Sequence, residues 1–309
     1  MYRSRPVHTY SIVARDPLTG EMGVAVQSHW FSVGTVVTWG EAGVGVVATQ
    51  AFSNPDFGPK GLELMRGGAG AQKALHALLR QDPGRELRQV ALLDAQGSVA
   101  AHTGKRCIPC AGHILATDFS VQANMMLNDR VWPEMAKRFD SWKGSLAERL
   151  LAALEAGEEA GGDIRGKQSA ALLVVRGQAT GRVWDDRTVD LRVDDSREPL
   201  EEMKRLLRVH RAYQHMNLGD EAMEREDMPM AMKHYSTAER LFPRNLEMRF
   251  WHAVALANNG RLEESLPIFH KVFRQDPDWR ELASRLVGVG MLKVDESGLR
   301  RIIGPRRAP

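Results

Sequence analysis

The chain has 309 residues, 43% of them hydrophobic, which is enough apolar material for one large or two medium domains. Its 42 basic and 39 acidic side chains nearly cancel, so nothing in its charge calls for nucleic acid or a membrane surface. No apolar run approaches the ~20 residues of a membrane-spanning helix. Two cysteines argue against a disulfide-built secreted domain, and residues 1–8 lack the apolar region of a secretory signal. A cytoplasmic protein is predicted.

The first structured stretch predicts strands. Polar and apolar residues alternate from Thr9 to Ala14, and Pro17 and Gly20 favour a turn directly after them. Further runs rich in valine and threonine follow, with strands predicted at 9–14, 23–27, 33–39 and 43–50. The short turns between them indicate an antiparallel meander, and its second and fourth strands are apolar on both faces.

Groups of helices and strands alternate along the next part of the chain. Helical periodicity with Pro or Gly boundaries predicts helices ending at Met65 and over 69–79, 129–139 and 146–159. Strands are predicted at 88–93, 98–102, 119–125, 168–176 and 188–193. Helices grouped between runs of antiparallel strands predict an α+β fold in αββα layers.

From about residue 199 the pattern becomes purely helical and repeats. Tyr235 and Phe269, and likewise Pro243 and Pro277, stand one 34-residue period apart. The segment resembles two tetratricopeptide repeats followed by a capping helix over 280–288. Since about three repeats are usually needed for stability, we expect this module to pack on the first domain or on a copy of itself. Plain helical packing and a partner-binding groove both remain open.

The opening hairpin carries a second resemblance. TYSIVARDPLTGEMGVAVQS, VVATQAFSNPDFGPKGLELM and VDLRVDD together resemble the family known as domain of unknown function 1028, over roughly residues 8–210. A Thr that opens a first strand before a GVAV strand also resembles the start of N-terminal-nucleophile (Ntn) hydrolases. The resemblance implies a four-layer Ntn-hydrolase-like sandwich but no particular reaction. The implied domains are a leader 1–8, the sandwich 9–205, the helical repeats 206–292 and a basic tail 293–309.

Thr9 occupies the position of the Ntn nucleophile. Such enzymes use the first residue's hydroxyl or thiol as nucleophile and its own α-amine as base. Activity would therefore require cleavage between His8 and Thr9, and the alternative is a Thr that merely opens a strand. Many Ntn enzymes place a cation beneath the nucleophile, whereas this chain has no Lys or Arg between Arg15 and Lys60.

Other polar residues are candidates for the same pocket. The catalytic candidates besides Thr9 are Ser28, Asn54 and His102. The resemblance also implies substrate-binding positions at Gln50, Thr103, Gly104, His113, Asn124, Gln168 and Ser169. Hydroxyl and amide groups of this kind would suit an oxyanion or an amide substrate, or they would only satisfy backbone groups at strand ends.

A Cys-x-x-Cys pair, Cys107 and Cys110, lies between His102 and His113. The spacing to the second histidine is too short for a usual zinc site, and Ala111-Gly112 is a poor start for the helix of a redox motif. We therefore predict no metal and no cofactor.

Two functions remain open. The first is an Ntn-type amidohydrolase acting on a small amide or peptide-like substrate. The second is a non-catalytic Ntn-fold binding or scaffold protein with a protein-interaction repeat domain. A homodimer or other homo-oligomer is predicted, and the repeats would offer a site for a protein partner.

Overall fold

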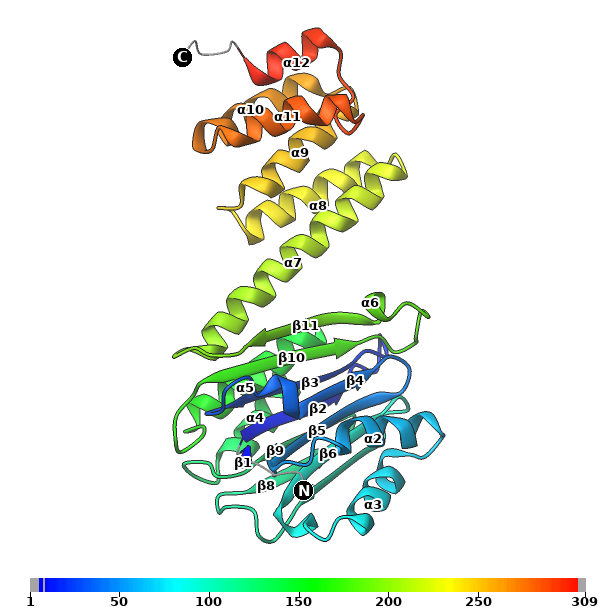
Figure 1. Cartoon of the computed structure of the whole chain (residues 1–309), viewed down its shortest axis with the longest axis vertical. Coiled ribbons are helices and arrows are strands. Elements are labelled where there is room, and N and C mark those ends of the chain that lie inside the picture. The colour runs from blue at the N-terminus through cyan, green and yellow to red at the C-terminus, as the bar shows by residue number, and fades with distance from the viewer. Residues whose placement is uncertain (1–5, 8, 305–309) are drawn as a thin grey trace. The chain divides into compact units, whose positions relative to one another are not determined.

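The computed structural model describes residues 6–7 and 9–304. The chain divides into two compact units, unit 1 up to Leu207 and unit 2 from Arg208. Unit 1 contains two antiparallel sheets with helices, and unit 2 is helical (Figure 1). The predicted α+β class is therefore confirmed.

The first sheet, sheet A, is built around one long central strand, β5 (Gly45–Phe52). One side of β5 pairs with β6 (Arg88–Asp94), which in turn pairs with β7 (Val99–Thr103). The other side pairs with β4 (Thr38–Glu41) near one end and with β1 (Pro6–Val7) near the other.

Sheet B follows the order β11-β10-β3-β2-β9-β8. These strands are β2 (Thr9–Arg15), β3 (Met22–Ser28), β8 (Gly112–Ala116), β9 (Phe119–Ala123), β10 (Ser169–Val175) and β11 (Arg187–Val193). Strand β2 comes first in the chain but lies inside the sheet. It pairs on one side with β3, its hairpin partner, and on the other with β9, which follows more than a hundred residues later.

The two sheets pack face to face through valine-rich inner faces. Val13, Val24 and Val26 of sheet B share a buried cluster with Val46 and Leu93 of sheet A. Because strand residues alternate between faces, the remaining apolar positions point outward and require cover from helices. The cover on sheet A comes from α2 (Phe57–Arg66) and α3 (Ala71–Gln81).

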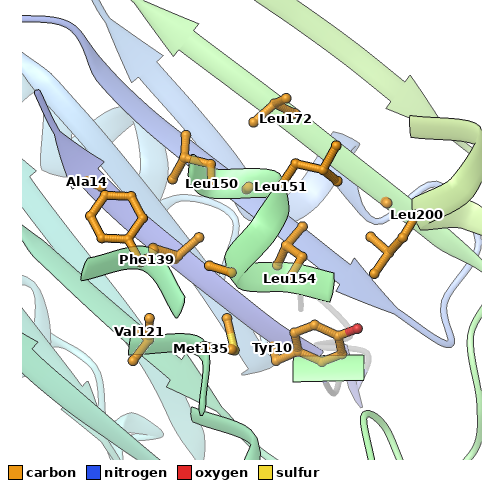
Figure 2. Close-up of a cluster of buried hydrophobic side chains, with 14 of the residues drawn as sticks. Tyr10, Ala14, Val121, Met135, Phe139, Leu150, Leu151, Leu154, Leu172 and Leu200 are labelled. Carbon is orange, nitrogen blue, oxygen red and sulfur yellow. The ribbon is translucent and has the colours of Figure 1, made fainter. Parts of the chain in front are cut away.

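The outer face of sheet B is covered by α4 (Val131–Ser141) and α5 (Leu146–Glu159). Figure 2 shows the resulting cluster, in which Phe139 and Leu150 lie among side chains of the sheet such as Tyr10 and Leu172. The start of α5 is fixed by a capping box, in which Ser145 and Glu148 bond each other's backbone N–H. Shorter elements are α1 (Gly34–Val37), the 3₁₀ turn η1 (Arg85–Leu87) and α6 (Val183–Asp186).

One predicted strand and the predicted meander are corrected. Residues 33–39 form α1 and the start of β4 instead of one strand, because here the chain crosses from sheet B to sheet A with Val33 and Val37 buried between them. The predicted four-strand meander is therefore wrong: β2 and β3 belong to sheet B, and β4 and β5 to sheet A. Strand β8 was not predicted.

Unit 2 takes most of the long helix α7 (Pro199–Glu224), whose first turns belong to unit 1. The helices that follow are α8 (Met228–Leu241), α9 (Leu246–Asn258), α10 (Leu262–Gln275), α11 (Asp278–Gly288) and α12 (Glu296–Ile303). Asp227 and Asn245 begin α8 and α9, because each side chain accepts a hydrogen bond from a first-turn backbone N–H. The segment predicted as a basic tail contains α12, whose Ile302 is buried. None of the helices in residues 9–304 is long and apolar enough to cross a membrane.

Candidate functional site

Thr9 is the first residue of β2, and its side chain lies on the face of the strand toward sheet A. The alternation of the strand points Thr9, Ser11 and Val13 toward sheet A, while Tyr10 points toward α5. Thr9 is fully buried and stands in register with Ser28, the last residue of β3.

The carbonyl oxygen of Thr9 accepts three hydrogen bonds. They come from the backbone N–H of Asn124 at 3.1 Å, from Asn124 Nδ2 at 3.3 Å and from Gln50 Nε2 at 3.2 Å. Gln50 belongs to sheet A, and Asn124 directly follows β9 of sheet B. Amides from both sheets therefore fix the backbone at Thr9.

These contacts belong to a larger group, here called the inter-sheet amide network and made up of Ser11, Gln50, Gln89, Gln122 and Asn124. All five residues are fully buried. The hydroxyl of Ser11 donates to Gln50 Oε1 and accepts from Gln122 Nε2, both at 2.6 Å. Since a buried polar group without a partner costs stability, a network this well satisfied is expected to hold the two sheets in one arrangement.

Gln89 of β6 is the centre of the network. Its Oε1 accepts from Gln50 Nε2 at 2.7 Å and from Asn124 Nδ2 at 2.8 Å. Its Nε2 donates to Thr103 Oγ1 and to the carbonyl of Ala123, both at 2.8 Å, with a longer contact to the carbonyl of Gly112 at 3.2 Å.

The network ends at a half-buried pair, Thr103 and His113. Thr103 Oγ1 lies 2.8 Å from His113 Nδ1. Burial lowers the pKa of His113, and the neighbouring His102 adds to the effect. The lowered pKa favours the neutral imidazole, which accepts a hydrogen bond at one ring nitrogen and donates one at the other.

Ser28 and Ser169 lie in a row beside Thr9 in sheet B, on β3 and then β10, but Ser169 already bonds the backbone. Ser169 is in register with Ser28, donates to the carbonyl of Trp30 and accepts from the N–H of Val33 at 3.1 Å. The side chain of Gln168 turns away and donates to Asp195 at 3.1 Å.

Three more candidates lie outside the network. His102 neighbours Thr103 along β7, so it points to the opposite face, where its Nε2 lies 2.9 Å from the carbonyl of Arg85. Asn54 precedes α2 and accepts from the N–H of Asp56 at 3.3 Å. At Gly104 an added Cβ would lie 2.3 Å from the carbonyl oxygen of Glu86, so this glycine permits a close backbone approach.

The surroundings of Cys107 disfavour thiolate chemistry at that residue. Both thiols are free, and Cys107 is buried with its Sγ 3.4 Å from the carbonyl of Arg88. Burial raises the pKa of Cys107 to about 11, which disfavours the thiolate needed for redox or metal chemistry. Among the residues described, no three His, Cys, Asp or Glu side chains gather as metal ligands.

Ser11, Gln89 and Gln122 were not among the predicted site residues. The alternation that points Thr9 inward also points Ser11 inward, so one signal for Ser11 was present in the sequence. Gln89 and Gln122 required knowledge of which strands pair.

Comparison with known proteins agrees with this fold. The model of a family described as "Family of unknown function (DUF1028)" matches residues 9–203. The crystal structure of protein SPO2555 from Silicibacter pomeroyi, assigned to the same family model, is similar at a TM-score of 0.60 and 32% identity, over 70% of this chain and 89% of that one. No curated protein matches the chain.

Proposed function

The chain belongs to the family of unknown function DUF1028, and this membership identifies no reaction. We propose that the protein is a latent Ntn-type amidohydrolase whose nucleophile is Thr9. The observation that carries the proposal is the place where the chain passes from one sheet to the other. Val7 of β1 pairs with Ala51 in sheet A, and Thr9 begins β2 in sheet B. The peptide bond before Thr9 therefore belongs to the link between the sheets.

Cleavage of that bond would supply the missing base. The hydroxyl of Thr9 would attack the carbonyl carbon of His8, the nitrogen of Thr9 would leave, and the resulting ester would be hydrolysed by water. Thr9 would then carry a free α-amine beside its own hydroxyl, which is the pairing that activates a Thr nucleophile. The three hydrogen bonds on its carbonyl support the proposal, because they would hold both groups in one orientation.

In turnover, the α-amine would take the proton of the Thr9 hydroxyl as the oxygen attacks the amide carbon of a substrate. The amine product would leave with that proton, and water would release the acyl group. Ser28, in register with Thr9, and the amides of Gln50 and Asn124 are the nearest candidates to bind the substrate. The hydroxyl and amide groups of these residues favour a small amide or peptide-like compound.

The finer assignments of fold are part of the same proposal. We infer an Ntn-hydrolase-like sandwich for unit 1 and two tetratricopeptide-like repeats for unit 2. The repeat assignment is supported by Tyr235 of α8 and Phe269 of α10, which stand 34 residues apart and are both buried. A homodimer, a cytoplasmic location and a protein partner for the repeats remain predictions.

A second candidate function is a non-catalytic binding or scaffold protein. It is favoured by the complete burial of Thr9, whose nitrogen is bonded to His8 in the encoded chain. In that case the inter-sheet amide network would serve stability alone.

Intact-mass measurement of the purified full chain distinguishes the two. The hydrolase proposal expects loss of residues 1–8 from the wild type, slower loss from Thr9→Ser and none from Thr9→Ala. Thr35→Ala, which removes an exposed hydroxyl, should be processed normally. The processed chain should hydrolyse members of a panel of small amides. If the wild type keeps its full mass and hydrolyses the panel no faster than Thr9→Ala, the hydrolase proposal is wrong and the binding or scaffold function is retained.

A further inference from the structure

Unit 2 contains a groove that the proposed hydrolase does not use. Its volume is about 820 Å³, within the range of ligand sites. One wall is a stripe on α7 formed by Tyr213, Asn217, Asp220 and Glu224, and the facing wall is a stripe on α9 running from Glu247 to Asn258. Side chains four and three residues apart share one face of a helix, so each stripe follows a single face.

The groove runs along both helices. Each stripe covers eleven residue steps, about 16 Å along a helix. The hydroxyl of Tyr213 donates to Glu247 at 2.6 Å near the start of both stripes, and Asn259 Nδ2 lies 3.7 Å from Met223 Sδ near their ends. A space of this length would take about five residues of extended chain.

The floor of the groove is apolar. Met216, Met248 and Val254 are buried beneath it, and the half-buried Trp251 contributes an aromatic face. Such a surface would bind aliphatic or aromatic side chains.

The walls are acidic. Four carboxylates line the groove, those of Asp220, Glu224, Glu226 and Glu247, against the single ammonium group of Lys293. Two of them accept hydrogen bonds from tyrosines, Glu247 from Tyr213 and Asp220 from Tyr235 at 2.7 Å. Desolvation raises the pKa of Asp220, and a bound cation would oppose that shift.

Polar side chains that can pair with a peptide backbone complete the lining. The exposed amide of Asn217 stands one helical turn before Asp220 and offers both a donor and an acceptor. A polyamine could also pair with the carboxylates. Its ammonium groups are donors only, however, so it would offer no acceptor to the N–H groups of the Asn217 side chain, whereas a peptide carbonyl would.

We propose that the groove between α7 and α9 binds an extended segment of a partner protein, about five residues long, that combines lysine or arginine with apolar residues. The length, the apolar floor and the acidic walls each favour this occupant. The proposal concerns unit 2 alone and does not depend on hydrolysis at Thr9.

Fluorescence anisotropy with the full chain tests it. The probe is a fluorescein-labelled peptide of alternating leucine and arginine, and its matched control carries glutamate in place of arginine. The arginine peptide should bind, and its binding should weaken at about 0.5 M salt, where charges are screened. The double variant Asp220→Asn, Glu247→Gln should weaken binding about tenfold, as expected for the loss of two charge contacts.

Glu221→Gln is the matched control for the protein. Glu221 neighbours Asp220 on α7, but its carboxylate pairs with Arg225 at 3.0 Å and does not line the groove, so its loss should leave binding unchanged. Equal affinity for both peptides, or an equal effect of the control variant, would overturn the proposal. Displacement of the arginine peptide by spermidine, added at the same concentration of positive charge, would also overturn the proposal. Tighter binding after deletion of residues 305–309, which include Arg306 and Arg307, would instead identify the chain's own tail as the occupant.

Discussion

Replacing Gln89 with leucine should remove the centre of the hydrogen-bond network between the two sheets. The side chains of Gln50 and Asn124 both donate to Gln89 Oε1, and in the variant each would keep only its remaining acceptors. Because both donors keep other acceptors, each lost hydrogen bond should cost only its net worth of about 0.5–1.5 kcal/mol, and the two together about 1–3 kcal/mol. Because small domains are stable by about 5–15 kcal/mol, the change should be easy to detect.

Hydrogen exchange followed by mass spectrometry is the assay, because it reports unit 1 and unit 2 separately in the full chain. Gln89→Leu should speed exchange in β6 and β9 and leave α8–α10 unchanged. Gln96→Leu, an exposed position in the turn after β6, should shift stability by less than about 0.5 kcal/mol. If Gln89→Leu behaves like Gln96→Leu, the network does not hold the sheets together.

Three further predictions concern single sites in unit 1. Ala51 has a φ of 66°, which is costly for any residue with a Cβ, so Ala51→Gly should cost nothing or stabilise by up to about 1 kcal/mol. Ala48→Gly in the same strand should destabilise, with urea unfolding as the readout. Burial lowers the pKa of His113 below 6.5, so its contribution to stability is complete above that pH and is lost as the pH falls through the lower folded value. Hydrogen exchange of β8 should follow this dependence in the wild type and lose it in His113→Gln. Iodoacetamide should label the half-buried Cys110 before the buried Cys107 in the folded chain, as peptide mass mapping would show, and equal rates would contradict the burial.

Much of unit 1 could be predicted because local signals agree with the final structure. Helix α5 occupies the predicted span 146–159, since its capping box and helical periodicity are both local features. Strand β8 was missed because its five residues follow Pro109 and carry little alternation. The segment 33–39 was misread because valines favour strands, whereas the crossing between sheets required a turn of helix there.

The site was predicted less completely because it depends on pairing between distant strands. Thr9, Gln50 and Asn124 do converge, although they lie on elements far apart in the chain. His102 and Thr103 were both candidates, yet successive strand residues point to opposite faces, so only one of the two could reach the network. Gln89 becomes central only once β6 is known to lie opposite β9, and no local pattern shows this.

The pairing of β1 with β5 bears on how Thr9 could meet a substrate in the proposed hydrolase. Within the described residues 6–7, the leader holds to β5 through Pro6 opposite Phe52 and Val7 opposite Ala51, and proline has no N–H to donate. The few hydrogen bonds available to such a strand are worth about 0.5–1.5 kcal/mol each. This is less than the roughly 4–15 kcal/mol that a separate peptide loses in freedom when it binds. The pairing of residues 6–7 alone would therefore not hold a separate peptide once the bond before Thr9 is cut. In the proposed hydrolase, that single cleavage would create the base.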